Sequence, residues 1–300
     1  MAADVPHRSF GAYADETVPQ AAVGAAGKSG RLELSFAADA DGRTRLVRDY
    51  ARTPFHVSGT LGHDPLDRAS TVCVQSPTGG VAQGDRHESH VRVGPDAVAR
   101  VGTASATKVH SMNRNYAATT TALTVESGGH LDYVPDPTIL HADARLCRDA
   151  RLDVARDASA VVGDVVVSGR LARGERFEFE RYYARLTGRG PDGRLFEDAS
   201  HLHPADDDPT APGVLGDFAV YGTLYAVAPS ADESALSDRL HDRVADGPGR
   251  AAATTLPNGA GVVVRALGDR SETVSTALHG AWDAARRELL DAPAPDWGRP

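Results

Sequence analysis

Three segments in the middle of the chain repeat one pattern: an alternating strand, a short turn rich in Gly or Asp, and a second strand. They span residues 91–98, 123–131 and 152–161, and Val93, Val125 and Val154 mark equivalent positions 32 and then 29 residues apart. A period of this size predicts stacked hairpins or a β-solenoid, in which each unit buries its apolar face on its neighbour. An ordinary β-sandwich with similar turns is the alternative.

The remaining pattern also favours strands. Residues 31–36 alternate polar and apolar, and a turn at 39–42 leads into residues 44–47, which predicts an opening hairpin. Two helices are expected near the C-terminus, one at 232–244 and one after Asp269, where Asp269 and Glu272 fit a cap. We therefore predict a mainly β, elongated, stacked-sheet or β-solenoid-like domain with two short C-terminal helices. Further strand candidates are residues 71–75, 160–167, 177–186, 223–227 and 262–264.

The 300 residues, of which 41% are hydrophobic, are enough for one large domain with a sizeable core. Residues 1–29 are rich in Ala, Gly and Pro without strand or helix periodicity, which predicts a flexible N-terminal tail. The ordered domain is expected over residues 30–291, including the C-terminal helix, with a tail at 292–300. Residues 201–213 read as an exposed acidic loop.

The formal net charge of -9 argues against nucleic-acid binding through a general basic face. Among the 32 basic residues, Lys28 and Lys108 are the two lysines. An acidic, lysine-poor surface is what a protein kept soluble in high salt would carry, and GC-rich coding is the other explanation. Cys73 and Cys147 lie far apart, so neither a disulfide framework nor a CxxC motif is indicated. With no secretory pattern and no membrane-length apolar run, we expect a cytoplasmic protein without membrane contact.

Short motifs for catalysis are weak. The stretch 22–29 ends like a phosphate-binding loop but begins with Ala22 and lacks the required strand and helix, so it reads as a linker. His87 and His90 are three residues apart and would point to opposite faces of a strand. His201 and His203 would share a face, although two solvated loop histidines are the commoner explanation.

A series of polar residues stands beside Gly-rich turns. Carboxylates and imidazole are suitable transient ligands for a divalent ion such as nickel, whose weak coordination permits release as well as capture. From the residues alone, turn capping and pairing with the abundant arginines is the preferred explanation. The series comprises Asp85, Arg86, Glu88, Lys108, His110, Asp132, Asp136 and Glu175.

Several blocks in order along residues 30–287 resemble the urease accessory protein UreD (UreH) family. Thr78 departs from the family's usual Gly, Asp132 and Tyr133 stand where it has Glu and Trp, and residues 141–144 match loosely. The matching blocks are residues 30–36 with 42–46, the Ser-Pro-Thr-Gly-Gly-Val and Gly-Asp-Arg pieces of 76–86, Ala-Thr-Lys-Val within 104–109, residues 131–140, residues 169–177, and Trp282 followed by Arg286 and Arg287.

The resemblance implies a urease maturation chaperone that is not itself an enzyme. Members bind the urease apoprotein subunits and the helical protein UreF, which recruits the GTPase UreG, and the assembly passes nickel to the urease active site. No tightly bound cofactor is implied, and Ni²⁺ would bind transiently. The resemblance also implies an elongated β fold and a nickel passage, for which Asp85, Glu88, His110, Asp132, Asp136 and Glu175 are the expected lining.

Four residues are expected at partner contacts: Lys108, Trp282, Arg286 and Arg287. The helix around Trp282 is the preferred UreF contact, because an aromatic anchor with adjacent Arg is typical of interface hot spots. Two other functions stay open. One is a β-rich hydrolase using an acid and a histidine, with Asp132 and His110 as first candidates, and the other is an interaction scaffold that never touches metal.

Overall fold

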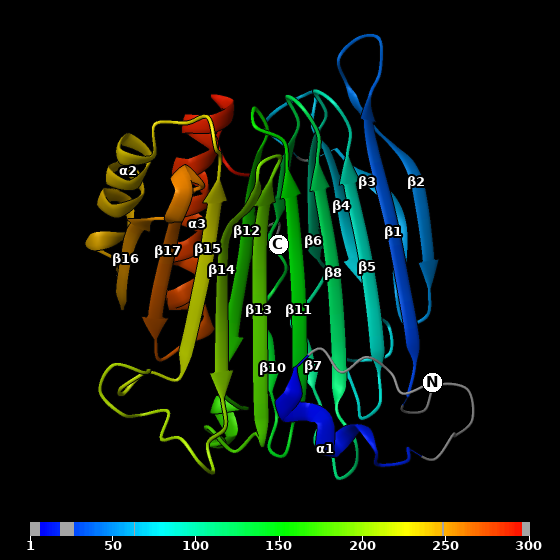
Figure 1. Cartoon of the computed structure of the whole chain (residues 1–300), viewed down its shortest axis with the longest axis vertical. Helices are drawn as coiled ribbons and strands as arrows, with labels where there is room; N and C mark the ends of the chain where they lie inside the picture. Colours follow the sequence, from blue (N-terminus) through cyan, green and yellow to red (C-terminus); the bar gives the residue numbers. More distant parts are fainter. Residues whose placement is uncertain (1–6, 19–26, 63, 248, 296–300) are drawn as a thin grey trace.

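The computed structural model describes residues 7–18, 27–62, 64–247 and 249–295, which form two β sheets packed face to face (Figure 1). Within these residues the first sheet has seven strands, in the order β14-β13-β11-β8-β5-β1-β2. Their bounds are β1 Ser29–Ala38, β2 Thr44–Arg52, β5 Arg86–Val93, β8 Ala117–Val125, β11 Arg145–Val154, β13 Arg181–Gly190 and β14 Gly193–Leu202.

The second sheet follows the order β16-β17-β15-β12-β9-β6-β4-β3, with the short strands β10 and β7 attached beside β12. Its strands are β3 His56–Leu61, β4 Ser70–Gln75, β6 Val98–Thr103, β7 Thr107–Val109, β9 His130–Tyr133, β10 Thr138–Leu140, β12 Ser159–Val167, β15 Val220–Val227, β16 Arg250–Thr255 and β17 Gly261–Gly268. The helices are α1 Gly11–Ala14, α2 Glu233–Ala245 and α3 Ser271–Leu290, and the 3-10 turns are η1 Arg8–Phe10, η2 Leu171–Arg173 and η3 Pro257–Gly259.

The repeat seen in the sequence is a solenoid rather than a stack of hairpins. In each unit the first strand lies in the first sheet and the second strand crosses to the second sheet. The pairing is between units: β5, β8 and β11 are parallel, with Val93 beside Val125 and Val125 beside Val154. The β-solenoid-like prediction is therefore confirmed with its register, and the opening hairpin of β1 and β2 is confirmed as well.

The main core lies between the two sheets. It is built from the alternate residues of each strand that face inward, such as Leu34, Leu123 and Leu152 from the first sheet and Val72 and Leu131 from the second. These side chains are at most 3% exposed. The C-terminal halves of β5, β8 and β11 carry this apolar core, whereas polar residues take their place in the N-terminal halves.

A second core lies between the outer face of the second sheet and the helices α2 and α3, which cover the end formed by β15, β16 and β17 (Figure 1). Gly222 of β15 permits this contact, because a Cβ there would lie 2.6 Å from Val274 and 2.7 Å from Leu278 of α3. None of the described helices is long and apolar enough to cross a membrane.

The two helices lie where they were predicted. Asp232 caps α2 by accepting the N–H groups of Ser234 and Ala235 at 3.1 Å. The expected cap by Asp269 is wrong, because β17 keeps the chain extended to Gly268 and the helix begins one residue later than the cap requires. Arg270 is the N-cap of α3 and offers no side-chain hydrogen bond.

The prediction of a flexible tail over residues 1–29 is wrong for the segment containing η1 and α1. Phe10 is fully buried on the outer face of the first sheet, against Tyr116, Cys147 and Tyr183. Local propensity is poor there, so these tertiary contacts stabilise the short helix. Residues 1–6 and 19–26 and the tail after residue 295 lie outside the described residues. The acidic loop is confirmed but begins at His203, since β14 continues to Leu202.

A buried ionic network fastens α3 to the second sheet. Arg286 of α3 donates to Asp132 of β9 at 3.0 Å and binds both oxygens of Asp64 at 2.7 and 2.9 Å. Trp282 Nε1 donates to Asp132 Oδ1 at 2.6 Å, and His130 Nε2 lies 3.1 Å from the same oxygen. The Arg286 side chain is 0% exposed, so these partners are its compensation for lost hydration.

We predict that Arg286→Met lowers the free energy of unfolding by about 3–5 kcal/mol, because Asp64 and Asp132 lose the guanidinium that binds both of them in the buried network. Arg287→Met on the exposed face of α3, which breaks only a pair with Asp283, should leave the stability nearly unchanged. Urea unfolding of both variants at pH 7 checks this. Equal losses in the two variants would contradict it.

The buried pair of Asp132 and Arg286 also makes the stability of the fold depend on pH. Burial opposes the charge of Asp132, but His130, Arg286 and Trp282 together outweigh it and hold the pKa of the carboxyl below its ordinary value. A lowered folded-state pKa contributes stability above the unfolded value of about 3.9, and that contribution is lost as the pH falls. The stability gap between the native chain and Arg286→Met should therefore narrow below about pH 4.

Candidate functional site: a polar layer between the sheets

A row of small and polar side chains crosses the inner face of the first sheet. Parallel pairing places His87 beside Thr119 and Thr119 beside Arg148, and the row continues through Ala184 to Ser200. Each of the first three lies four residues before a buried core position of its own strand, so alternation points it inward. Those core positions are Val91, Leu123 and Leu152.

The next inward row is also free of bulky apolar side chains. It pairs Ser89 with Thr121 and Thr121 with Ala150. Two successive rows of the solenoid therefore leave a polar layer where a sandwich would ordinarily be filled with aliphatic groups. On the opposite sheet this layer meets Tyr133 of β9 and Asp164 of β12.

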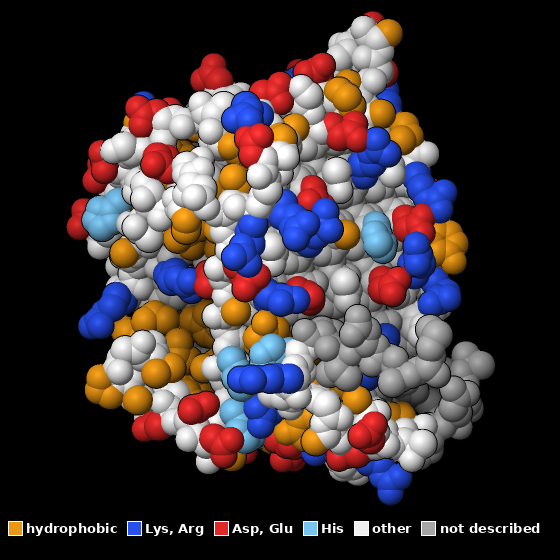
Figure 2. Space-filling view, viewed as in Figure 1, with side chains coloured by type: hydrophobic (Ala, Val, Ile, Leu, Met, Phe, Trp, Pro, Cys, Tyr) orange, Lys and Arg blue, Asp and Glu red, His pale blue; other side chains and the backbone are white. Residues whose placement is uncertain are grey.

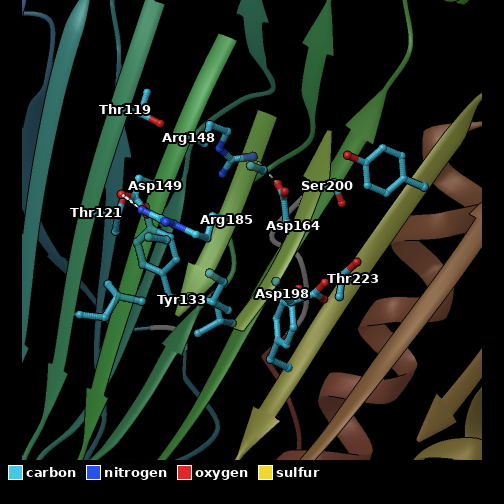
Figure 3. A pocket seen from close by; sticks show the side chains of 18 residues that line it. Thr119, Thr121, Tyr133, Arg148, Asp149, Asp164, Arg185, Asp198, Ser200 and Thr223 are labelled. Carbon is cyan, nitrogen blue, oxygen red and sulfur yellow. Dashed lines mark hydrogen bonds and ion pairs between the residues drawn. The ribbon is translucent and has the colours of Figure 1, made fainter. Parts of the chain in front are cut away.

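Two adjoining cavities occupy the polar layer. One has a volume of about 340 Å³ and extends toward β4, β7 and the Gly-rich turn at 79–80. The other, of about 70 Å³, extends toward β13, β14 and β15 (Figure 3). Both are lined by Thr119, Thr121, Tyr133 and Arg148, which therefore mark their junction. A polar space of this size has room for several water molecules.

Arg148 and Asp164 face each other across the layer, one from each sheet (Figure 3). Arg148 Nη1 donates to Asp164 Oδ1 at 2.6 Å, and the Tyr182 hydroxyl lies 3.4 Å from the other oxygen. Burial opposes the charge of Arg148, but the field of Asp164, Tyr182 and Tyr133 raises the pKa of its guanidinium. Arg148 is thus held in its charged form, and Asp164 is its ion-pair partner inside the layer.

A second carboxylate, that of Asp198 on β14, lines the smaller cavity of the polar layer. Tyr225 of β15 donates its hydroxyl to Asp198 Oδ2 at 2.6 Å, and Arg265 of β17 forms an ion pair with the same oxygen. Burial and the Asp198 carboxylate raise the pKa of Tyr225, so the phenol stays protonated. Ser200 and Thr223 add hydroxyl groups between Asp164 and Asp198 (Figure 3).

His87 is an inward-facing residue with an unsatisfied polar group. It is 6% exposed, it lines the larger cavity, and its Nε2 has no hydrogen-bond partner. Asp85 Oδ2 lies 3.9 Å from that nitrogen but is held by the N–H of Ala82, while Oδ1 accepts from Lys28 N–H. Burial lowers the pKa of His87, and Asp85 opposes this only in part, so the imidazole is neutral.

Two of the residues expected from sequence line the larger cavity. Asp136 borders it and exchanges hydrogen bonds with Thr103, accepting from its hydroxyl at 3.1 Å. Lys108 borders it from β7 and also lines an open cleft on the other side of that strand. Asp85 lies behind His87, next to the cavity but not on its wall. Asp85, Lys108 and Asp136, all singled out from the sequence, thus lie on one side of the polar layer.

His110 lies on the cleft and not on the cavity, and Glu175 lines neither but binds Arg170 of the cleft wall. His110 lines the cleft, where its ring stands edge-on to His141 with centroids 5.3 Å apart. Glu175 is 6% exposed and binds Arg170, and its other oxygen accepts the N–H of Ala142 at 2.7 Å. The structure thus gives Glu175 a structural partner at the rim of the cleft.

Glu88 and Asp132 are not part of the polar layer. Glu88 points away from it on the exposed face of β5 and pairs with Arg31 at 3.1 Å. Asp132 faces α3 on the opposite side of the second sheet, within the buried network. The expected metal positions therefore divide among four surroundings, and among the described residues no group of three or more His, Cys, Asp or Glu side chains converges to hold a metal ion.

The partner residues expected on α3 also lie in two different surroundings. Trp282 and Arg286 are fully buried, so within this chain they have internal roles, whereas Arg287 is exposed on the outer face of the helix. A partner contact at this helix stays a prediction. The figures show the opposite face of the molecule, where acidic and basic side chains alternate closely over the first sheet (Figure 2).

The pair expected for a hydrolase is not assembled. Asp132 is bound to His130, Trp282 and Arg286, and His110 contacts Gly79 O and His141. The predicted opposite orientation of neighbouring histidines on β5 is confirmed, since the first faces the cavity and His90 faces solvent.

The polar layer itself went unrecognised in the sequence, although the signal was present. The offsets of 32 and 29 residues that align Val93, Val125 and Val154 also align His87, Thr119 and Arg148. Reading the repeat at those columns would have shown the polar row. Asp164 and Asp198 could not have been found this way, because they lie outside the three repeats.

Known proteins identify the family. The model of the UreD urease accessory protein family matches residues 28–297. A urease accessory protein UreD from Haloarcula marismortui is 66% identical over 98% of both chains, and one from Natronomonas pharaonis is 45% identical over 96% of both. One from Photorhabdus laumondii is 33% identical over 93% of this chain and 88% of its own. With the solenoid and its near-complete coverage, these matches establish that the chain belongs to the UreD family of urease accessory proteins, which act in urease maturation.

Proposed function

We propose that this chain is a non-catalytic maturation chaperone that guides nickel toward the urease active site through the polar layer between its sheets. The observation that carries the passage is the continuous inward row from His87 to Ser200 with its two joined cavities. Nickel is the cargo here and not a resident cofactor. We place this activity in the cytoplasm.

The chemistry of the layer suits a hydrated divalent ion in transit. Hydroxyl groups of Thr119, Thr121 and Ser89 can exchange hydrogen bonds with its water shell, and Asp136 supplies negative charge at one side. The neutral imidazole of His87 is a nitrogen ligand of the kind that nickel accepts. Because Arg148 is balanced by Asp164, the junction does not present an isolated positive charge to the ion.

The partners in this proposal are the urease apoprotein subunits and UreF, through which the GTPase UreG joins. Membership of the UreD family supports a role among urease and other accessory proteins. The solenoid offers broad, rigid surfaces suited to a scaffold. We place no catalytic residue in this chain.

Deleting this reading frame from a complete urease operon should abolish nickel-dependent urea hydrolysis in lysate, and supplying the chain in trans should restore it. Urease subunit levels must be equal in the strains being compared. Unchanged activity in the deletion strain would sink the maturation role.

Neutralising one member of the junction pair tests the passage. Asp164→Asn leaves Arg148 as an unbalanced cation at the junction, and we expect urease activation to fall by about tenfold or more. Removing both charges, with Asp164→Asn and Arg148→Gln together, should recover much of that loss. Asp192→Asn breaks an exposed pair with Arg156 and serves as the matched control.

Activation is measured as urea hydrolysis and nickel content of urease after co-expression, with pull-down of urease by each variant. If Asp164→Asn and the double variant activate urease as well as the native chain while remaining folded, the layer carries no nickel and the metal-free scaffold is the better account. Loss of urease binding in the single variant would assign the defect to docking instead.

A further inference from the structure

The molecule has an open cleft of about 1250 Å³ between β7, β10, the turn η2 and the beginning of α3. Its basic lining consists of four residues from three separate segments: Lys108 on β7, Arg170 and Arg173 around η2, and Arg270 at the start of α3. His110 and His141 complete this side of the cleft. A cleft with this lining is unexpected on a chain whose net charge is -9.

Three of these four cations form no close ion pair within the described residues. Arg170 is paired with Glu175, but among the described residues no Asp or Glu oxygen lies within 4.0 Å of the Lys108, Arg173 or Arg270 side chains. Asp269 and Glu272 are the acidic residues on the wall. Elsewhere many arginines of this chain are paired, such as Arg185 with Asp149 and Arg151 with Asp153.

Two further features add to the positive field. The first turn of α3 lines the cleft and Arg270 gives it no side-chain cap, so the positive end of a 20-residue helix dipole lies at the cleft wall. Burial lowers the pKa of His141, and Arg170, His110 and Lys108 lower it further while Glu175 opposes them. Three of the groups around His141 are thus basic side chains that oppose a positive charge on its ring.

The cleft is also partly apolar and larger than a small-ligand pocket. Ile139 and Leu171 lie on its wall among the basic residues. Small-molecule sites are usually about 300–1,000 Å³ and enclosed, whereas this space is open along one side. An extended peptide with acidic and aliphatic residues complements both the charge and the apolar contacts.

We propose that this cleft is the docking site for an acidic peptide segment of a partner protein. Carboxylates of the segment pair with Lys108, Arg173 and Arg270, and its aliphatic side chains contact Ile139 and Leu171. The cleft adjoins the nickel passage at Lys108, which lines both spaces, but the proposal does not depend on transport through the polar layer. Nucleic acid does not fit, because the chain carries a net charge of -9.

The test uses the full chain and a fluorescein-labelled peptide of sequence Asp-Glu-Leu-Asp-Glu-Leu-Asp-Glu, with binding followed by fluorescence anisotropy. We expect saturable binding that weakens as salt is raised, and no binding of the matching Lys-Lys-Leu peptide. The double variant Arg173→Glu, Arg270→Glu should lower affinity at least about tenfold.

The control is Arg43→Glu, Arg189→Glu, which makes the same change in net charge at two exposed arginines outside the cleft. It should bind the acidic peptide within about twofold of the native chain. Equal losses in both double variants would reduce the effect to overall charge and overturn the site. Inorganic phosphate displacing the peptide at equal concentration would also overturn it, in favour of a small-anion site. Thermal unfolding of each variant verifies that the chains compared are folded.

Discussion

Parallel, in-register stacking of the solenoid units is the constraint on which the rest of the structure depends. Because each unit places the same column of its sequence beside that of its neighbours, one column decides the character of an entire level between the sheets. The column containing Val93, Val125 and Val154 makes an apolar level, and the column containing His87, Thr119 and Arg148 makes a polar one. Core and cavity are thus two consequences of one register.

A polar level inside a sandwich is stable only when its groups are satisfied, since burying an unpaired charge is expensive. The structure meets this requirement mainly by pairing across the layer, with Arg148 to Asp164 and Tyr225 to Asp198. Water can satisfy the hydroxyl groups in the cavities. The nitrogen of His87 and the hydroxyl of Tyr221 have no hydrogen-bond partner, and both residues lie on the cavity walls where a solute would pass.

The sequence was sufficient for those features that local periodicity determines. Alternation and the repeat predicted the solenoid, its register and the two helices. It was insufficient where distant segments meet. Trp282 and Arg286 were expected at a partner surface, but they are internal because Asp132 and Asp64 approach α3 from elsewhere in the chain. Phe10 is ordered by contacts with the first sheet that no local pattern reveals.

The site residues follow the same division. Asp136, expected in the passage lining, and Lys108, expected at a partner contact, both border the larger cavity, because both lie near turns that join successive solenoid strands. Glu88 was expected in the passage lining but faces solvent. Alternation along β5 directs its neighbour His87 inward instead. Asp164 was missed because its partner Arg148 lies in the other sheet, and contacts between sheets leave no periodic trace in the sequence.

The most direct test of the passage is chemical modification at its junction. In a chain carrying Cys73→Ser and Cys147→Ala, Thr119→Cys faces the cavities and Thr120→Cys faces solvent on the same strand. Both are treated with a small cationic methanethiosulfonate, and urease activation is measured before and after. The account predicts that modification at position 119 abolishes activation while modification at position 120 leaves it intact. Full activation by a chain that is completely modified at position 119 would contradict it.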